Sequence, residues 1–497
     1  MRSEGTATSF SPLGWIAPFW RQVRSRLLLR TEDDVLILPP NRVYKLNSTA
    51  KALLLFLEAG GRLAEFPGLD EKKARDTDAF FRSLEAALSG RRPDADRVAY
   101  DFTFTRLPVL AELAVTYRCN NRCRFCYAGC SAGTACRRPG SAVPGATPEP
   151  GTGTDGPATL PGRSEVEDLP ARDLERIIRI FREEAKVPFF SFTGGEPLLR
   201  EDLPRLVRFA ERLGLRTNLV TNGTLATPSR ARALFRAGLR TAQVSLEAPE
   251  PGIHDYLCGV PGAWERSLAG IRALRRAGIS VQTNTTATRA NLDALEGMPA
   301  LAASLGVDRM SMNLFIPTSR SPEAAALFVS YREIGPVVDR VRKRAREAGV
   351  DFLWYSPTPM CLYNPLARGL GNKNCAACDG LLSVNPRGDV LPCSSWDEGL
   401  GNLLTDGFSK VWFGERATSL KNKEYAPAEC RSCPAFAACQ AACPLYWSYA
   451  GYGEIQAAGP AFRERSARPA PSMEAKPAEP GSTDGPARGG DDERPFP

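Results

Sequence analysis

Fourteen cysteines and a single histidine are the chemically distinctive residues of this 497-residue chain. The apolar patch at 13–20 contains Pro18 and precedes basic residues instead of following them, so it does not read as a secretory signal. In a chain that is not exported, clustered cysteines are more often metal ligands or catalytic groups than a disulfide framework. One histidine excludes most Cys/His zinc sites. The sequence therefore predicts metal chemistry carried by thiolates alone.

Three of the cysteines lie close together in the run TYRCNNRCRFCY, directly after a predicted strand at 113–117. Three thiolates on one loop, from Cys119, Cys123 and Cys126, can bind three corners of a cubane 4Fe-4S cluster, whereas a complete structural site needs four ligands. The missing ligand would leave one iron open. The alternatives are a fourth ligand from Cys130 or Cys136, and an inert zinc or ferredoxin-like site.

Short apolar runs alternate with amphipathic helices over the middle of the chain, a pattern typical of βα units around a parallel sheet. A helix is predicted where Leu174, Ile177, Ile178 and Phe181 share one face, and Gly214 fits a left-handed end of the next helix. Parallel strands carry functional groups at their carboxyl ends, whether the sheet is open or barrel-like. The predicted strands are 113–117, 189–193, 217–221, 241–246, 280–285 and 310–316.

The spacing C-x3-C-x2-C, with the aromatic Phe125 before the last cysteine, resembles the signature of radical S-adenosylmethionine (radical SAM) enzymes. Three further motifs of that family, GGEP, TNG and SLE, follow at successive predicted strand ends. The resemblance covers roughly 113–317 and implies that Cys119, Cys123 and Cys126 hold a SAM-binding 4Fe-4S cluster. It also implies that SAM is contacted by Phe125, Gly194, Gly195, Glu196, Thr221, Asn222, Ser245 and Glu247.

The same resemblance implies an α/β fold, a partial (β/α)6 TIM-like barrel in which SAM is cleaved reductively to a 5′-deoxyadenosyl radical. The protein would bind and orient these groups and exclude water. The chain departs from the family in one place, where the frequent Arg of a His-Asp-x-x-Arg-Gly run is replaced by Cys258. We expect Cys258 to be a small buried side chain or else a reactive thiol, and His254 to be structural. Neither is assigned to catalysis, and the catalytic residues stay unknown.

A second group of cysteines lies between 361 and 443. The runs Cys378-x9-Gly388-x4-Cys393 and Cys430-x2-Cys433-x5-Cys439-x3-Cys443 resemble the SPASM extension of radical SAM enzymes, which holds auxiliary 4Fe-4S clusters. A zinc ribbon is the alternative, but its two CxxC pairs usually lie about 15 to 20 residues apart, far closer than the pairs at 375/378 and 430/433.

The SPASM resemblance implies two ligand sets. The first cluster would be held by Cys378, Cys393 and Cys443, completed by Cys375 or Cys361. The second would be held by Cys430, Cys433 and Cys439. The usual final cysteine of the family is absent, so the second cluster would take a non-Cys ligand, use Cys361, have an open iron or be missing.

The first hundred residues form a different kind of unit. The sequence predicts a hairpin from 35–39 and 43–46, a helix at 48–59 with Ser48 as its N-cap, and a helix at 78–88. The hairpin resembles that of PqqD-like peptide-recognition domains, small winged-helix-like units that bind a leader peptide as an additional strand. A generic hairpin-plus-helix cap is the alternative. The basic run of Arg21, Arg24, Arg26 and Arg30 indicates a solvated face.

Two Gly/Pro-rich segments contain too few apolar side chains to offset the entropy of ordering them. We therefore expect a PqqD-like domain at 1–95, a barrel at 108–320 with a flexible insertion at 128–165, a SPASM domain at 355–457 and a disordered tail at 458–497. The net charge of +8 is spread along the chain, so no nucleic-acid partner is expected. No run approaches the roughly 18 apolar residues of a membrane span, so we expect a cytoplasmic protein.

Together these features predict a radical SAM/SPASM maturase, an oxidoreductase-type enzyme that modifies a ribosomally synthesised peptide or a protein side chain. The expected cofactors are S-adenosylmethionine, a SAM-binding 4Fe-4S cluster and one or two auxiliary 4Fe-4S clusters. The expected partners are a precursor peptide or protein substrate and an external electron donor such as flavodoxin or ferredoxin. The alternatives are a tetrapyrrole (heme-type) side-chain modifying radical SAM enzyme and a non-catalytic iron-sulfur electron-transfer scaffold.

Overall fold

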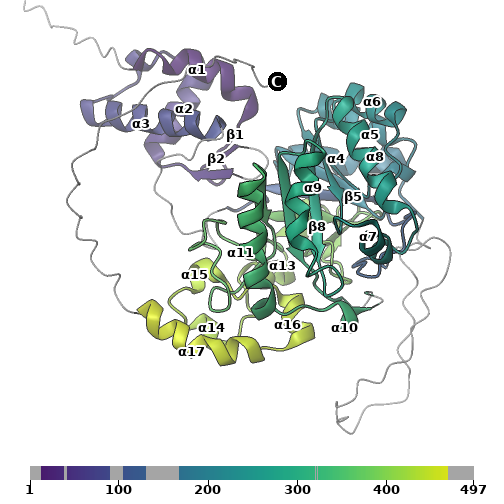
Figure 1. Cartoon of the computed structure of the whole chain (residues 1–497). Coiled ribbons are helices and arrows are strands. Elements are labelled where there is room, and N and C mark those ends of the chain that lie inside the picture. The colour runs from purple at the N-terminus through teal and green to yellow at the C-terminus, as the bar shows by residue number, and fades with distance from the viewer. Residues whose placement is uncertain are drawn as a thin grey trace, which may run out of the picture.

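A computed structural model describes residues 13–38, 42–89, 105–129, 167–318, 321 and 323–467. Nearly all of the predicted insertion lies outside these ranges, as do Cys130 and Cys136. Figure 1 shows the described chain as a purple N-terminal unit, a teal and green barrel, and yellow C-terminal helices. No helix of the described residues is long and apolar enough to cross a membrane.

The centre of the largest sheet is the barrel that the sequence predicts. All six predicted strands are present, hydrogen-bonded in chain order, and each adjacent pair is parallel. The predicted α/β fold with a partial barrel is therefore confirmed. The strands are β4 (Leu110–Thr116), β5 (Phe189–Gly194), β6 (Arg216–Thr221), β7 (Thr241–Ser245), β8 (Ser280–Ala287) and β9 (Arg309–Leu314).

Amphipathic helices connect these strands and pack on the outside of the sheet (Figure 1). The helix predicted around Leu174 is α4, and its four predicted face residues are all buried. The next helix ends just before Gly214, whose φ of 73° is left-handed as predicted. The helices are α4 (Ala171–Glu183), α5 (Leu203–Arg212), α6 (Pro228–Ala237), α7 (Pro251–Cys258), α8 (Ala263–Arg276), α9 (Met298–Ser304), α10 (Ala324–Leu327) and α11 (Tyr331–Glu347).

The sheet extends beyond the predicted strands on both sides. β10 (Asp351–Trp354) adds parallel to β9, and β11 (Leu381–Val384) adds parallel to β4. β12 (Asp389–Leu391) and β13 (Gly401–Asn402) continue antiparallel from β11. These strands are too short for an apolar period to stand out in the sequence. Because β11 pairs with β4, the C-terminal cysteine region is joined to the barrel by main-chain hydrogen bonds.

The N-terminal unit has a three-stranded antiparallel sheet with the order β1-β2-β3. The predicted hairpin and both helices are present, but Asn47, not Ser48, caps α2, because its Oδ1 accepts the Ala50 N–H at 2.8 Å. The third helix begins earlier than predicted, where the side chain of Asp70 caps it. The elements are α1 (Ile16–Val23), β1 (Leu28–Arg30), β2 (Val35–Leu38), β3 (Arg42–Lys45), α2 (Ser48–Glu58) and α3 (Glu71–Leu88).

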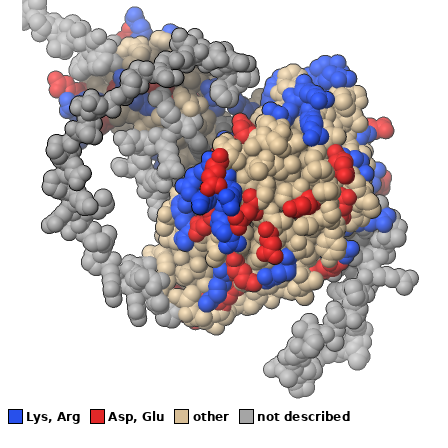
Figure 2. All heavy atoms as spheres, in the orientation of Figure 1, with Lys and Arg blue, Asp and Glu red and all other residues tan. Residues whose placement is uncertain are grey.

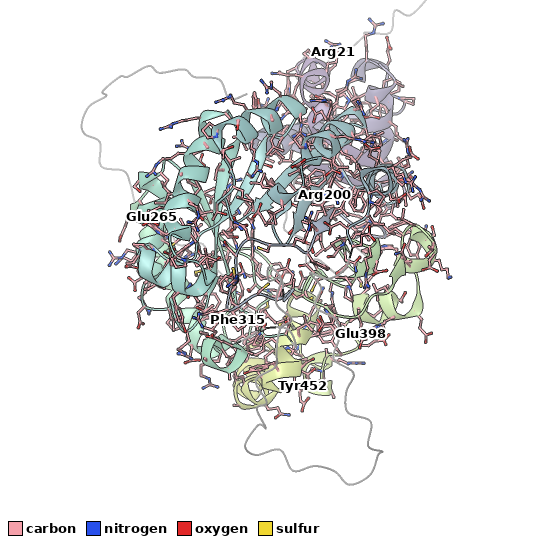
Figure 3. All side chains as sticks on the ribbon, turned by 90° about the vertical axis from the view of Figure 1, so that its right-hand side faces the viewer. Arg21, Arg200, Glu265, Phe315, Glu398 and Tyr452 are labelled. Atoms are coloured by element: carbon pink, nitrogen blue, oxygen red, sulfur yellow. The ribbon has the colours of Figure 1, made fainter. Side chains whose placement is uncertain are left out.

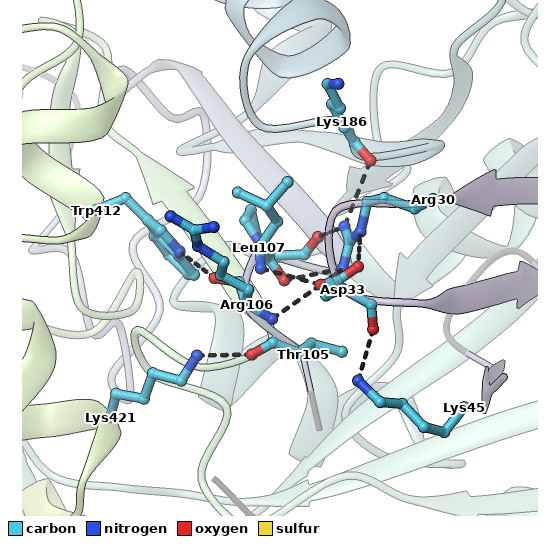
Figure 4. A network of polar contacts seen from close by, with 10 residues as sticks. Arg30, Asp33, Lys45, Thr105, Arg106, Leu107, Lys186, Trp412 and Lys421 are labelled. Atoms are coloured by element: carbon cyan, nitrogen blue, oxygen red, sulfur yellow. Dashed lines mark hydrogen bonds and ion pairs between the residues drawn. The ribbon is translucent and has the colours of Figure 1, made fainter. Parts of the chain in front are cut away.

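A buried ion pair attaches this unit to the barrel (Figure 4). Arg21, Arg24 and Arg26 are exposed as expected, but Arg30 is only 1% exposed, so the prediction of a solvated face was wrong for this residue. Its guanidinium donates to both carboxylate oxygens of Asp33, each at 2.7 Å. The remaining contacts explain the burial, because the same guanidinium also donates to the carbonyls of Leu107 and Pro108 at the entrance to β4.

The segment 105–108, which receives these contacts, also meets the C-terminal part of the chain. Asp33 Oδ2 accepts the backbone N–H groups of Arg106 and Leu107 at 2.8 and 3.2 Å. From the other side, Lys421 donates to the carbonyl of Thr105 at 2.7 Å, and the Trp412 indole donates to the carbonyl of Arg106 at 3.1 Å. We call residues 105–108, with Arg30 and Asp33, the junction, because all three parts of the protein meet there.

Short helices surround the C-terminal cysteines. The sequence indicated that order ends at 457, whereas the last helix continues to Ala467, because Ile455 and Gly459 on it are buried. The helices are α12 (Phe408–Trp412), α13 (Glu415–Lys421), α14 (Ala428–Arg431), α15 (Phe436–Cys439), α16 (Pro444–Ala450) and α17 (Gly453–Ala467).

Charged side chains of both signs share the surface. On the face drawn in Figure 2, basic and acidic side chains are intermixed over α11. Two basic residues of α11, Arg340 and Arg344, pair with Glu296 at 2.5 and 3.4 Å. Exposed pairs of this kind each contribute at most about 1 kcal/mol to stability.

Candidate metal and cofactor centre

The loop after β4 carries Cys119, Cys123 and Cys126, and the end of α7 holds it in place. The backbone N–H groups of Arg122 and Arg124 donate to the last carbonyls of α7, at 2.9 Å each. Gly259, which follows α7, has a φ of 66°, and a Cβ there would lie 2.4 Å from the carbonyl oxygen of Arg122. Only glycine therefore allows the helix end to approach the cysteine loop this closely.

The glycines of the GGEP motif bring the end of β5 against the same loop. The Gly195 N–H donates to the Thr116 carbonyl at 2.7 Å, and the Glu196 N–H donates to the Arg118 carbonyl at 2.9 Å. Gly194 has a φ of 137°, and a Cβ there would lie 2.1 Å from the Thr116 oxygen. These two glycines thus permit a backbone contact within the protein, in addition to the contact with SAM that the sequence predicts.

Glu196 links the predicted strand-end motifs to one another. Its buried carboxylate accepts the Thr221 hydroxyl at 2.7 Å and the backbone N–H groups of Asn222 and Leu198 at 2.8 and 3.0 Å. Burial raises the pKa of this carboxyl. The Asn222 amide in turn lies 4.0 Å from the Cys119 sulfur. The motifs at the ends of β4, β5 and β6 therefore form one hydrogen-bonded group.

The fourth predicted motif lies at the end of β7, where Ser245 closes the strand and Glu247 follows it. The Glu247 carboxylate is 1% exposed and accepts the Thr286 N–H at 2.8 Å. Burial raises its pKa to about 7. The charge of Glu247 also helps to raise the pKa of Cys123, so this carboxyl lies near the cysteine loop.

His254 and Cys258 lie behind the cysteine loop. The backbone N–H of Glu247 donates to His254 Nδ1 at 3.1 Å, so the ring proton is on Nε2, which lies 3.4 Å from the Cys258 sulfur. Burial lowers the pKa of His254, which favours the neutral form of the ring. A hydrogen bond with Cys258, together with burial, raises the pKa of Cys123. Cys258 is therefore a small buried side chain, which was one of the two alternatives that we expected from the sequence. It also contacts Cys123, a predicted metal ligand.

Phe125, the aromatic residue of the cysteine motif, packs against apolar side chains. It is half-buried in a small apolar cluster with Leu257, Phe315 and Leu327. Figure 3 shows Phe315, just after β9, on the side of the barrel that faces the C-terminal helices around Tyr452. Phe125 therefore fixes the cysteine loop to the end of the barrel.

The three loop cysteines suit a cluster better than a single metal ion. In the described part of the chain, no three His, Cys, Asp or Glu side chains surround a point where one ion would fit. A cubane binds each thiolate through a different iron, so its ligands need not converge on one point. Burial and the nearby Cys123 and Cys126 thiols raise the pKa of Cys119, so the thiolate form requires a compensating cation. The donor set and its surroundings fit the predicted 4Fe-4S site.

The C-terminal cysteines divide into two groups. In the first group, burial raises the pKa values of Cys378 and Cys443 to about 12, and the charge of the nearby Cys375 adds to the effect. Burial also raises the pKa of Cys393, with further contributions from the charges of Cys375 and Cys443. We call Cys375, Cys378, Cys393 and Cys443 group one. The remaining four, Cys361, Cys430, Cys433 and Cys439, line a single small cavity of about 20 Å³ and form group two.

An unusual backbone segment connects the groups. Gln440, Ala441 and Ala442, between Cys439 and Cys443, all have positive φ values, of 53°, 55° and 59°. The Trp447 indole donates to the Ala441 carbonyl at 2.5 Å, and the Tyr425 hydroxyl donates to the Ala442 carbonyl at 2.9 Å. Left-handed backbone is unfavourable for side-chain-bearing residues, so the surrounding contacts must hold this segment.

The inner face of the barrel is polar, which sequence reasoning missed. Gln282 donates to the hydroxyl groups of Ser311 and Tyr355 at 2.9 and 2.8 Å, and Ser383 of β11 donates to Glu112 of β4 at 2.6 Å. Burial raises the pKa of Glu112. Along β8, in the run SVQTNTTA, every second residue is polar and incompletely buried, and the residues between them are buried. This alternation was the sequence signal that could have predicted a polar inner face. A polar interior of this kind suits a substrate rich in hydrogen-bonding groups.

Two family models match the chain. Radical SAM superfamily matches residues 113–298, and SPASM, described as an iron-sulfur cluster-binding domain, matches residues 375–434. The first match contains the three loop cysteines, and the second contains five of the eight C-terminal cysteines, from Cys375 to Cys433. Both matches lie in the parts of the chain in which we predicted these domains.

Curated relatives and solved structures agree with these matches. An AdoMet-dependent heme synthase of Methanosarcina barkeri is 30% identical over 268 residues, 50% of this chain and 74% of that protein. A PqqA peptide cyclase of Xanthomonas axonopodis pv. citri is 30% identical over 256 residues, 49% of this chain and 66% of that one. The crystal structure of Streptococcus suis SuiB bound to precursor peptide SuiA has a TM-score of 0.61 at 17% identity, covering 85% of this chain and 95% of SuiB.

The SuiB likeness shows a shared fold, and the heme synthase alignment spans most of that relative. The predictions of a radical SAM domain, of a SPASM extension, and of SAM and iron-sulfur clusters as cofactors are confirmed. The alternative of a non-catalytic scaffold is thereby set aside. This chain belongs to the radical SAM superfamily of enzymes.

Proposed function

We propose that this radical SAM enzyme is a maturase of ribosomally synthesised peptides and that its N-terminal unit binds the leader of the precursor. The observation that carries the proposal is a groove of about 280 Å³ between the last strand and the last helix of that unit. Tyr44 of β3 lines one side, and residues of α3 line the other: Asp76, Ala79, Phe80, Ser83 and Leu84.

A groove bounded by a strand and a helix suits an extended peptide. Main-chain hydrogen bonds along β3 would supply affinity, and the groove would select alternate side chains, which is the PqqD-like mode that the sequence predicts. The aromatic rings of Tyr44 and Phe80 offer apolar contacts, and the exposed carboxylate of Asp76 favours a basic group in the leader. The comparisons support a peptide substrate, because one relative is named a PqqA peptide cyclase and SuiB was crystallised with its precursor peptide.

We further propose that Cys119, Cys123 and Cys126 hold the SAM-binding cluster, and that the strand ends carrying Gly194 to Glu196, Thr221, Asn222, Ser245 and Glu247 bind SAM. When bound, these groups supply a 5′-deoxyadenosyl radical. The residues of the chain position these groups. The Glu196 carboxylate fixes the turn after β6 by accepting the Asn222 N–H, and His254 fixes the turn after β7 by accepting the Glu247 N–H. The substrate would lie in the polar barrel interior. An external electron donor and a cytoplasmic location remain part of the proposal.

The first experiment tests the radical chemistry. The protein is reconstituted anaerobically with iron and sulfide, reduced with dithionite and incubated with SAM. We expect 5′-deoxyadenosine from the parent and none from the triple variant Cys119→Ala/Cys123→Ala/Cys126→Ala, which should still contain the iron of the C-terminal groups. Absence of 5′-deoxyadenosine from a fully reconstituted parent would contradict the assignment.

The second experiment tests the substrate class. Fluorescein-labelled peptides encoded by short reading frames beside this gene are titrated with the full-length protein. Ser83→Trp, which fills the groove, should weaken leader binding at least 10-fold, whereas Glu71→Trp places the same ring on an exposed part of α3 outside the groove. Equal binding by both variants would refute the groove as the leader site.

A tetrapyrrole substrate is the second candidate, because the heme synthase of Methanosarcina barkeri is as similar to this chain as the peptide cyclase. If none of the adjacent peptides binds and a porphyrin precursor is decarboxylated with consumption of SAM, this candidate replaces the first.

A further inference from the structure

We propose that Cys361 is the fourth thiolate ligand of the second auxiliary cluster, which the chain would then coordinate completely through Cys361, Cys430, Cys433 and Cys439. The inference rests on the iron-sulfur function of the C-terminal cysteines given above, and it goes beyond the SPASM match, which begins only at residue 375. It also decides between the four possibilities that the missing final cysteine leaves open.

The geometry of the cavity is the main argument. Four cysteines from two separate parts of the chain, Cys361 and the segment 430–439, line the same cavity. All four are half-buried, so they are neither locked in the core nor dispersed on the surface. The other lining residues are almost all apolar, including Pro359, Phe436, Ile455 and Phe462. An apolar wall around four cysteine side chains suits a thiolate-bound cluster that is shielded from water.

A turn in the chain presents Cys361 to this cavity. The carbonyl of Pro359 accepts the N–H groups of Leu362 and Tyr363, both at 3.0 Å, which closes a turn around Cys361. On the same turn, the Met360 N–H donates to the Cys439 sulfur at 3.3 Å. The residue before Cys361 therefore already contacts a ligand of the cluster, in the way that backbone N–H groups support metal-bound sulfur.

Group one does not require Cys361. It contains four thiols of its own, because Cys375 lies beside Cys378, Cys393 and Cys443. The left-handed segment from Gln440 to Ala442 separates Cys443 from Cys439 and sends the two thiols to different groups. Eight cysteines thus divide into two sets of four, and Cys361 belongs to the set that lacks the family's final cysteine.

The chemical consequence is that the second cluster has no open iron. A substrate or an added ligand has no coordination position there, in contrast to the three-cysteine site after β4. The site is therefore suited to electron transfer and not to binding a substrate.

The test uses the triple variant Cys119→Ala/Cys123→Ala/Cys126→Ala as its parent, so that only the C-terminal clusters contribute. After anaerobic reconstitution, this parent should hold about eight irons per chain, as two 4Fe-4S clusters require. A parent with no iron would contradict the auxiliary-cluster function itself, whatever the role of Cys361. Iron content and electron paramagnetic resonance spectra of the reduced protein are then compared between variants.

Adding Cys361→Ala should reduce the iron to about four per chain, or retain it with a second-cluster spectrum that changes when imidazole is added. Cys361→Ser, which keeps the shape and a weaker oxygen ligand, should retain more iron than alanine with a shifted spectrum. Cys375→Ala is the matched control, because it should remove the signal that Cys361→Ala leaves. If Cys361→Ala has the same iron content and the same spectrum as its parent, and if imidazole changes neither spectrum, then Cys361 is not a ligand and the assignment is wrong.

Discussion

The junction allows the attachment of the N-terminal unit to be tested with a single substitution. Asp33→Ala removes both oxygens that accept from the Arg30 guanidinium at 2.7 Å, and it also removes the acceptor for the N–H groups of Arg106 and Leu107. The guanidinium would then stay buried without a counter-charge, since Arg30 is only 1% exposed. Loss of one partner of a buried ion pair costs about 3 to 5 kcal/mol.

The readout is hydrogen exchange at the junction itself. If the penalty acts on local opening, the amides of Arg106 and Leu107 should exchange about 100-fold faster or more, since each 1.4 kcal/mol is a factor of about ten. The matched control is Glu32→Gln, which removes the half-exposed pair between Glu32 and Lys186 across the same boundary. A pair of that exposure is worth at most about 1 kcal/mol, a change of about fivefold or less.

The same variant also has a functional readout. Asp33→Ala should slow modification of a precursor that carries its leader, while the release of 5′-deoxyadenosine without peptide stays at the parent rate, because the junction lies away from the cysteine loop. If Asp33→Ala changes exchange at Arg106 and Leu107 no more than Glu32→Gln does, the junction does not hold the unit in place and the reasoning fails.

Three further predictions concern the SAM site. Gly194→Ala places a methyl group 2.1 Å from the Thr116 oxygen and should abolish iron binding at the loop after β4 while leaving the C-terminal iron, as measured by iron analysis. The pKa of Glu247 is raised from 4.5 to about 7, so its contribution to stability falls as pH rises through this window, by about 3 kcal/mol in total. Glu247→Gln should remove that part of the pH dependence in denaturant titrations of the metal-free chain at pH 5 and 8, and an unchanged difference would count against it. Cys258→Ala should shift the midpoint potential of the SAM-site cluster at constant iron content, because Cys258 contacts the predicted ligand Cys123 and changes the surroundings of its sulfur, and an unaltered potential would show that Cys258 only fills space.

The barrel and its motifs could be predicted because their signals are local. The strands β4 to β9 alternate with amphipathic helices along the sequence, and β4, β5, β6 and β7 each end in a motif whose residues have a fixed spacing. The burial of Arg30 could not be predicted in this way, because its partners include carbonyls of residues 107 and 108, far away in the sequence. The basic run around it gave the opposite indication.

The local sequence pattern also could not predict how the C-terminal cysteines divide into two groups. Cys361 and Cys375 are both upstream of the motif, and spacing alone cannot say which of them faces Cys378 and which faces Cys430. That depends on the turn at Pro359 and on the left-handed segment before Cys443, which are set by tertiary contacts. The apolar packing of Phe125 was likewise not predictable from its place in the motif, because Phe315 and Leu327 lie far away in the sequence.

From the left-handed segment at Gln440 to Ala442, we expect folding of the C-terminal region to depend on cluster assembly. Three such residues cost about 3 to 6 kcal/mol together, at 1 to 2 kcal/mol each. In a region of this kind, the free energy of metal binding contributes to the free energy of folding. Without metal, only the hydrogen bonds from Trp447 and Tyr425 and the packing of the core would offset the cost of this backbone conformation. A newly made chain in an iron-starved cell would therefore leave its C-terminal helices open to proteases, and the amount of enzyme would follow cluster assembly as well as gene expression.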